Sequence, residues 1–186
     1  LVMALDAIRP GQEEKRWPPY VALGGLGVAL IATITLWGCD TRVLFVLSCA
    51  SFALFIKAVA LVAAALVVLL SDAYIRAHSR YQGEFYALLL FAIIPICLLG
   101  GATNLILVFL GLDFLSIVSY ILTGFLRDDS RSAEAAMKYF LYGAALSALM
   151  MYGMSWFYGL TGSTDLSAIA TELTAMGAGG ARLLAL

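Results

Sequence analysis

The chain of 186 residues is 63% hydrophobic, has charges on only 12% of its residues and carries a formal net charge of −1. Soluble domains usually have about twice that share of charged residues. The composition therefore excludes an ordinary soluble enzyme, and the net charge gives no reason to expect nucleic acid as a partner. Apolar runs of about 20 residues recur, each long enough to cross a hydrocarbon core of about 30 Å, which predicts an all-α, polytopic bundle of transmembrane helices.

The hydrophobic runs divide one membrane domain, residues 1–186, into complete and partial spans. The complete spans are predicted at about 18–38, 47–71, 84–101, 104–126 and 132–160, with partial spans at 1–8 and from about 180. Because the first residue is Leu1 and the last stretch resembles the opening of another helix, we expect a fragment of a longer protein.

Some residues within the spans have predicted structural effects. Gly24, Gly25 and Gly27 would let a neighbouring helix approach closely. Lys57 interrupts the second apolar stretch, and its simplest role is to extend its ammonium group to the lipid headgroups. Pro95 removes a backbone donor and is expected to kink its helix.

The connections between spans differ in positive charge. Most of the Lys and Arg residues fall in alternate loops, whereas the opposite loops carry only Arg42 and Arg182. By the positive-inside rule, the richer loops face the cytoplasm; they are residues 9–17, 72–83 and 127–131. The connection after residue 160 is longer and has room for an interfacial helix.

An acid lies within the apolar stretch "LVFLGLDFLSIVSY", residues 107–120. An ionisable residue inside a membrane span is costly, and its default interpretation is functional. Ser116, Tyr120 and Thr123 follow Asp113 at spacings that place them on the same helix face. This stripe predicts a proton-carrying path. The alternative is that Asp113 is a protonated or hydrogen-bonded packing residue between helices.

The following span has a polar stripe of its own, formed by Glu134, Lys138 and Tyr142. Glu134 and Lys138 can pair at i,i+4, which also offers Lys138 a purely structural role. Because side chains lean toward the N-terminus of their own helix, we do not expect Asp113 to bridge Lys138 directly. Waters and hydroxyls between them would form a proton relay. Gly143 and Ser147 form a small-residue pair suited to close helix contact.

The cysteines and the histidine give no sign of a metal or redox site. Cys39, Cys49 and Cys97 lie in or beside apolar stretches and are expected to pack as small hydrophobic residues. His78 lies in a polar connection and cannot form a metal site alone. No cofactor is expected in this chain.

Three stretches resemble subunit N of the proton-pumping NADH:quinone oxidoreductase, respiratory complex I. They are "EFYALLLFA" (84–92), "NLILVFLGLDFLSIVSYILTGFLRDDSRSAEAAMKYFLYGA" (104–144) and "YGMSWFYGLTGSTDL" (152–166). This is a family of antiporter-like membrane subunits, related to the Mrp-type cation/proton antiporters.

The resemblance implies roles for two residues. Asp113 stands where the family has a mid-membrane glutamate, and Lys138 matches a lysine in "K-Y-F". In the family both belong to a polar axis that moves protons, driven by redox chemistry in other subunits. Asp in place of Glu shortens the acid by one methylene. The family's main lysine, on the helix that follows, would fall beyond Leu186.

The resemblance also implies partners and a location. They are the other membrane subunits of complex I and the lipid bilayer, in the inner (plasma) membrane of a bacterium, with quinone and NADH bound only at the level of the complex. The chain would thus be part of an enzyme without redox chemistry of its own. Two alternatives stay open: a subunit of an Mrp-type cation/proton antiporter, and a membrane scaffold without a transport role.

Overall fold

The computed structural model describes the chain except for residues 1–16, 38–41, 44–46, 49–50, 80 and 180–186. The predicted all-α bundle is confirmed, with one short hairpin in which β1 and β2 pair antiparallel. The predicted partial spans at 1–8 and from about 180 lie outside the described residues. The described elements are α2 (Pro18–Thr35), β1 (Arg42–Val43), β2 (Leu47–Ser48), α3 (Ser51–His78), α4 (Gln82–Leu99), α5 (Leu105–Thr123), α6 (Ser130–Thr161) and α7 (Leu166–Gly179).

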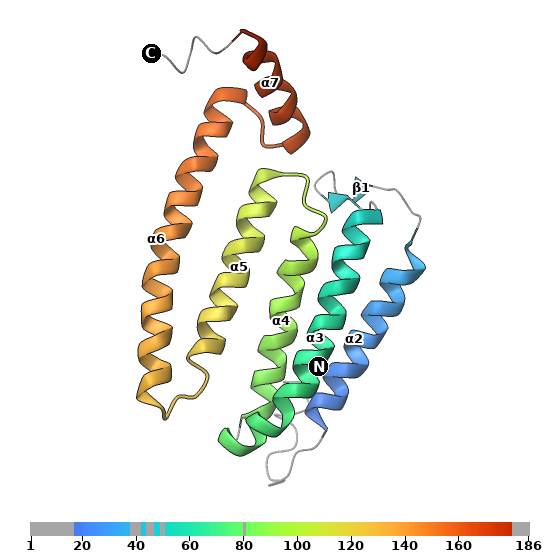
Figure 1. Ribbon diagram of the computed structural model, residues 1–186, viewed down its shortest axis with the longest axis vertical. Helices are drawn as coiled ribbons and strands as arrows, with labels where there is room; N and C mark the ends of the chain where they lie inside the picture. Colours follow the sequence, from blue (N-terminus) through green and yellow to red (C-terminus); the bar gives the residue numbers. More distant parts are fainter. Residues whose placement is uncertain (1–16, 38–41, 44–46, 49–50, 80, 180–186) are drawn as a thin grey trace.

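The helices α2 to α6 stand side by side, each packed against the next in the chain, and α7 lies beyond the upper end of α6 (Figure 1). All five are long and apolar enough to cross a membrane, and each predicted complete span overlaps one of them. The end of α3, the start of α4 and the connection 124–129 lie at the lower end of the bundle, where α2 also begins (Figure 1).

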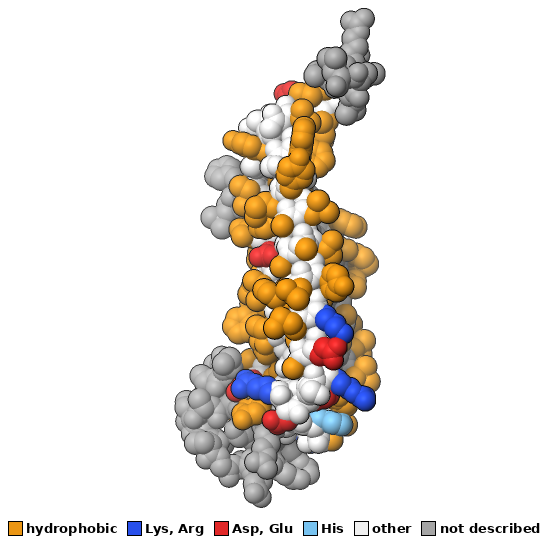
Figure 2. Space-filling model, turned by 90° about the vertical axis from the view of Figure 1, so that its left-hand side faces the viewer, with side chains coloured by type: hydrophobic (Ala, Val, Ile, Leu, Met, Phe, Trp, Pro, Cys, Tyr) orange, Lys and Arg blue, Asp and Glu red, His pale blue; other side chains and the backbone are white. Residues whose placement is uncertain are grey.

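The buried core lies between α2, α3 and α4. A single cluster of buried side chains joins the three helices, with Leu26, Val68 and Tyr86 near its centre. In contrast, α6 has no buried residue and packs its lower and middle turns on α5. Hydrophobic side chains cover most of the α6 face of the molecule, and charged ones gather toward its lower end (Figure 2). Such an apolar outer surface is what lipid solvates.

The second span differs from its prediction at both ends. We expected it at about 47–71, followed by a polar connection over 72–83, but α3 runs from Ser51 to His78. The predicted loop is helical because its polar groups satisfy one another along the helix. Asp72 and Arg76 form an i,i+4 ion pair, and the ring of His78 stacks on Tyr74 at 4.3 Å. Basic residues in a last turn also interact favourably with the helix dipole.

Two further predictions concern single residues. A Cβ atom at Gly24, Gly25 or Gly27 would meet nothing within 4 Å, so no described helix makes the close approach expected there. Pro95 is buried within α4, which continues without a break to Leu99. The kink at this proline stays a prediction.

The start of α5 is joined to the connection between α6 and α7 at the upper end of the bundle. The Asn104 side chain accepts a hydrogen bond from the Ile106 N–H (2.9 Å) and donates one to Thr164 Oγ1 (2.9 Å). The backbone adds bonds from Leu105 N–H to Thr164 O (2.7 Å) and from Leu166 N–H to Thr103 O (2.9 Å). We call this set of bonds the upper loop contact. It ties together two connections that are 60 residues apart. The long connection after residue 160, which has room for a helix, contains α7.

Asn104→Ala is expected to lower the stability of the folded chain by about 1–2 kcal/mol, because it removes a helix N-cap and a partly buried hydrogen bond. The measurement is the thermal unfolding midpoint of the purified protein in detergent. Asn104→Asp is the matched control, since it keeps the acceptor for Ile106 N–H and loses only the donor to Thr164. An alanine variant that melts with the wild type would show that the Asn104 side chain contributes nothing to the stability.

Candidate functional site

Asp113 lies one residue from the middle of α5 and is partly buried. No described residue forms a hydrogen bond or an ion pair with its carboxyl group. The face of α5 that packs on α4 is marked by Gly111, where a Cβ would lie 2.8 Å from Leu99 Cγ, and by the buried Val118. At about 100° per residue, Asp113 lies on the opposite side of α5, turned toward α6.

The hydroxyl groups predicted beside Asp113 donate to the backbone of their own helix. Ser116 Oγ donates to Leu112 O (2.8 Å) and Thr123 Oγ1 donates to Ser119 O (2.8 Å). Such bonds engage the hydroxyl hydrogen and leave its oxygen lone pairs free to accept. Each oxygen can therefore accept a hydrogen bond from a water molecule and hold that water in place.

Tyr120 makes the closest contact between α5 and α6. A Cβ added at Gly143 would lie 1.8 Å from Tyr120 Oη and 2.5 Å from its Cζ, so the phenol occupies the space that the glycine leaves open. The ring also packs edge-on against Tyr139 (4.8 Å between centroids) and Phe140 (5.8 Å). The small residue predicted to permit a close helix contact therefore does so.

Sequence reasoning missed two residues that belong to this contact. Ser119 Oγ lies 3.3 Å from Tyr139 Oη and donates to Ser116 O (2.7 Å). Both side chains stand one residue from a predicted member of a stripe, and the spacing rule excluded them for that reason. The signal that could have found them is the run of hydroxyl-bearing residues Ser116, Ser119, Tyr120 and Thr123 along the helix.

The second predicted stripe is turned away from α5. The residues of α6 that meet α5 include Ser132, whose Oγ donates to Thr123 O (2.7 Å), and Ala136, whose Cβ is 2.8 Å from a Cβ built at Gly124. Lys138 lies about half a turn of the helix away from Ala136. It forms the predicted ion pair with Glu134, and both side chains are exposed, at 67% and 63%. Tyr142 is also exposed, at 73%.

Asp113 and Lys138 are also separated along the helix axis. The contacts of Gly124 with Ala136 and of Ser119 with Tyr139 set the antiparallel register of α5 and α6. Extended upward, this register places Asp113 at the level of Ser147, nine residues from Lys138, or about 13 Å along the axis. The structure therefore brings together Asp113, Ser116, Tyr120 and Thr123 on the α6 side of α5, and it does not bring Glu134, Lys138 and Tyr142 to them.

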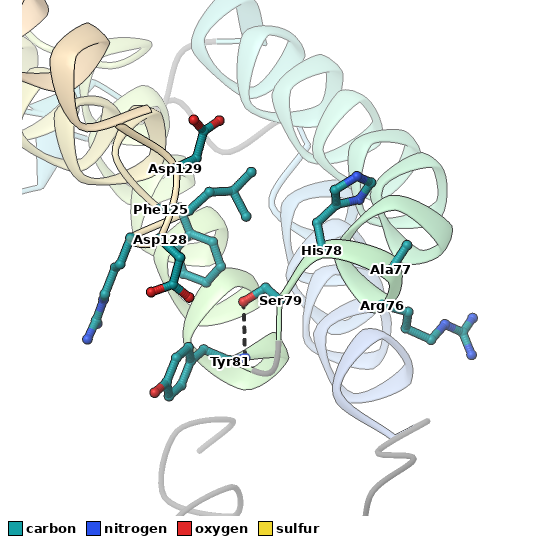
Figure 3. Close-up of a pocket in the computed structure, with 10 residues that line it drawn as sticks. Arg76, Ala77, His78, Ser79, Tyr81, Phe125, Asp128 and Asp129 are labelled. Carbon is teal, nitrogen blue, oxygen red and sulfur yellow. Dashed lines mark hydrogen bonds between the residues drawn. The ribbon is translucent and has the colours of Figure 1, made fainter. Parts of the chain in front are cut away.

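A polar cavity of about 810 Å³ opens at the lower end of the bundle, between the α3–α4 and α5–α6 connections. Arg76 and His78 stand on one side of it and Asp128 and Asp129 on the other (Figure 3). Arg127, which also lines the cavity, donates to Glu84 Oε2 (3.1 Å). This cavity is far from Asp113, which lies at mid-height in α5.

The described residues include no group of three or more His, Cys, Asp or Glu side chains that could hold a metal ion. Cys97 is partly buried in an apolar setting and has a free thiol. His78 is exposed at the lower end of α3. Cys39 and Cys49 lie outside the described residues.

The second half of the chain matches a known family. Residues 102–186 fit the family model described as NADH:quinone oxidoreductase/Mrp antiporter, TM. The matched region begins just before α5 and includes Asp113 and Lys138.

Most of the chain is similar to subunits of quinone oxidoreductases. It is 41% identical over 177 residues to NAD(P)H-quinone oxidoreductase subunit 2 of Thermosynechococcus vestitus. The matched region covers 94% of this chain and 34% of the relative. The chain is 37% identical over 183 residues to NADH-quinone oxidoreductase subunit N 1 of Koribacter versatilis, with coverages of 92% and 36%. The chain thus spans about a third of the length of these curated relatives.

A solved structure has the same helix arrangement. One chain of respiratory complex I from Thermus thermophilus with bound aureothin superposes with a TM-score of 0.73 at 30% sequence identity. The superposition covers 89% of this chain and 35% of that chain.

Proposed function

This chain belongs to the antiporter-like membrane subunits of the NADH:quinone oxidoreductases, and from that premise we propose that it carries protons across the membrane as part of such a complex. The energy comes from redox chemistry in other subunits. The NADH and quinone sites and the redox cofactors belong to those subunits, and the chain contributes a multi-pass path for protons.

One observation carries this proposal, namely the carboxyl group of Asp113 in the middle of α5, without a hydrogen-bond or ion-pair partner among the described residues. A charged side chain at the centre of a membrane helix costs about 3 kcal/mol or more. A packing residue that avoids this cost needs a hydrogen bond, and none of the described side chains provides one to Asp113. A group that must bind and release protons is instead best kept accessible to water.

The residues around Asp113 suggest the steps of the path. Water between α5 and α6 would exchange protons with the carboxyl group, and the free lone pairs of Ser116 Oγ would hold that water in place. Tyr120, which packs against Gly143, narrows the space between α5 and α6 about one turn below Ser116 and two turns below Asp113. A conformational change in the complex would then decide from which side Asp113 receives its proton.

Lys138 has a smaller part in the proposal than the sequence suggested. Its exposed ion pair with Glu134 faces away from α5, so it can join the path only through a neighbouring helix or subunit that packs on the outer face of α6. Glu134, Lys138 and Tyr142 would line a second part of the proton path, between α6 and such a partner.

The proposed location follows from charge. The last turn of α3 and the α5–α6 connection stand at the same end of the bundle (Figure 1). The arginines of the predicted loops 72–83 and 127–131 favour the cytoplasmic side by the positive-inside rule. The predicted third cytoplasmic loop, 9–17, lies almost wholly outside the described residues. The relatives named above come from bacteria, which supports the inner (plasma) membrane.

NADH-driven proton uptake by inverted membrane vesicles that contain the complete complex tests the proposal. Uptake that requires NADH and proceeds without sodium is expected. Exchange of sodium for protons in the absence of NADH would instead support the Mrp-type antiporter. A scaffold without transport would be indicated if the loss of the carboxyl group at Asp113 left uptake unchanged.

A further inference from the structure

An apolar groove runs along the upper half of the three-helix core, separate from Asp113 and α6. Its open cavity of about 550 Å³ is lined by α2, α3 and α4, with Leu61 contributed by α3 and Leu90 and Ile94 by α4. This size falls within the range of about 300–1,000 Å³ that is common for sites that bind small molecules.

The wall formed by α2 is unusually low. It includes Leu26 and the small residues Gly25, Ala29 and Thr33, which are spaced four residues apart and so share one face. Nothing lies within 4 Å of a Cβ built at Gly25, and the Thr33 hydroxyl is used by its donation to Ala29 O (2.8 Å). The groove therefore offers an apolar channel about 12 Å long that lacks hydrogen-bond donors along this wall.

Lys57 supplies the single positive charge of the groove lining. It is partly buried, and no described residue forms an ion pair or a hydrogen bond with its ammonium group. It lies six residues from the start of α3, about 9 Å below the upper end of the helix. Its side chain is long enough to raise the charge toward the headgroup region while its methylenes stay in the groove.

We propose that this groove binds an anionic phospholipid, with one acyl chain against Gly25, Ala29 and Leu90 and the phosphate group beside Lys57. An acyl chain needs an apolar channel without hydrogen-bond partners, which is what the groove lining provides. The phosphate supplies the negative charge that the described chain does not offer to Lys57. A helix of a partner protein would need to bring both a flat apolar face and an acid at the same depth.

Photo-crosslinking in the purified, assembled complex tests this site. The probe is phosphatidylglycerol with a photoreactive group on its acyl chain, and the readout is labelling of peptides from α2, α3 and α4 by mass spectrometry. Lys57→Gln is expected to reduce this labelling about fivefold, since one basic residue near the membrane surface contributes about that much to the binding of an anionic lipid. Lys57→Arg keeps the charge and is expected to keep the labelling.

A pair of glycines provides a control for the acyl chain. Gly25→Leu places a side chain in the groove and is expected to reduce labelling, whereas Gly24→Leu changes the neighbouring residue outside the groove lining. Neither Cβ meets an atom within 4 Å, and the thermal unfolding midpoints of both variants show whether each keeps the fold. Equal labelling by the phosphatidylcholine analogue, labelling unaffected by Lys57→Gln, or crosslinks from the groove to another subunit would each overturn the proposal.

Discussion

Asp113→Asn is expected to slow NADH-driven proton uptake about tenfold or more, because a positioned acid–base group typically contributes at least that factor to proton transfer. The amide has nearly the same shape as the protonated acid but does not bind and release a proton near neutral pH. Since α5 meets α4 through Gly111 and Val118, on its other side, the change leaves the packing of the helix intact. Uptake is measured with a pH-sensitive dye in inverted vesicles.

Two controls make the result specific to the carboxyl group. Asp113→Glu retains the acid and is expected to stay within about threefold of the wild type. Reduction of a water-soluble electron acceptor by NADH checks that the redox subunits are intact, and the amount of this chain in the purified complex checks that the variant is assembled. Normal uptake by Asp113→Asn in fully assembled complex would remove Asp113 from the proton path and leave it a packing role.

Gly143→Leu is expected to destabilise the chain by about 2–3 kcal/mol, the cost of inserting extra methylenes into a packed contact. A Cβ at this position would lie 1.8 Å from Tyr120 Oη and 2.5 Å from Cζ. The ring cannot simply turn aside, because Tyr139 and Phe140 pack against it from the same helix as Gly143. The thermal unfolding midpoint in detergent and the amount of assembled complex in membranes should both fall.

Gly153 offers the matched control on the same helix. A Cβ at Gly153 meets nothing within 4 Å, so Gly153→Leu should melt close to the wild type. Combining Gly143→Leu with Tyr120→Ala removes the clashing ring and should restore part of the lost stability. If the two single leucine variants were equally stable, the close contact between Tyr120 and Gly143 would not exist in the folded protein.

Hydrophobicity predicted the five long helices that the structure describes, because each span must be apolar over a fixed length. It could not fix their ends where polar residues continue a helix beyond the membrane. The last turns of α3 contain Asp72, Arg76 and His78, which resemble a loop by composition yet form i,i+4 contacts along a helix. The upper loop contact was equally hidden, since it depends on a pairing between Asn104 and Thr164 that no local pattern encodes.

The structure groups the predicted site residues of α5 on the side that faces α6, and it turns those of α6 away from α5. Spacing correctly grouped Asp113 with Tyr120, but spacing shows which residues share a face and not where that face points. Spacing shows that Glu134, Lys138 and Tyr142 share one face of α6, and the structure turns that face away from α5. The better indicator was the small residue Gly143, because only a small residue permits the approach that Tyr120 makes.

The connections at the two ends of α5 and α6 limit how these helices can move. The upper loop contact joins them at one end, and at the other they are linked by residues 124–129, with Ser132 bonded to Thr123. Because α5 and α6 are connected at both ends, they cannot slide past each other along their axes. The movements that remain are bending of the central turns of α5 and α6 and rotation of side chains at the level of Asp113. A conformational change that moves a proton between α5 and α6 would therefore be a small widening and narrowing of the space between them near Asp113.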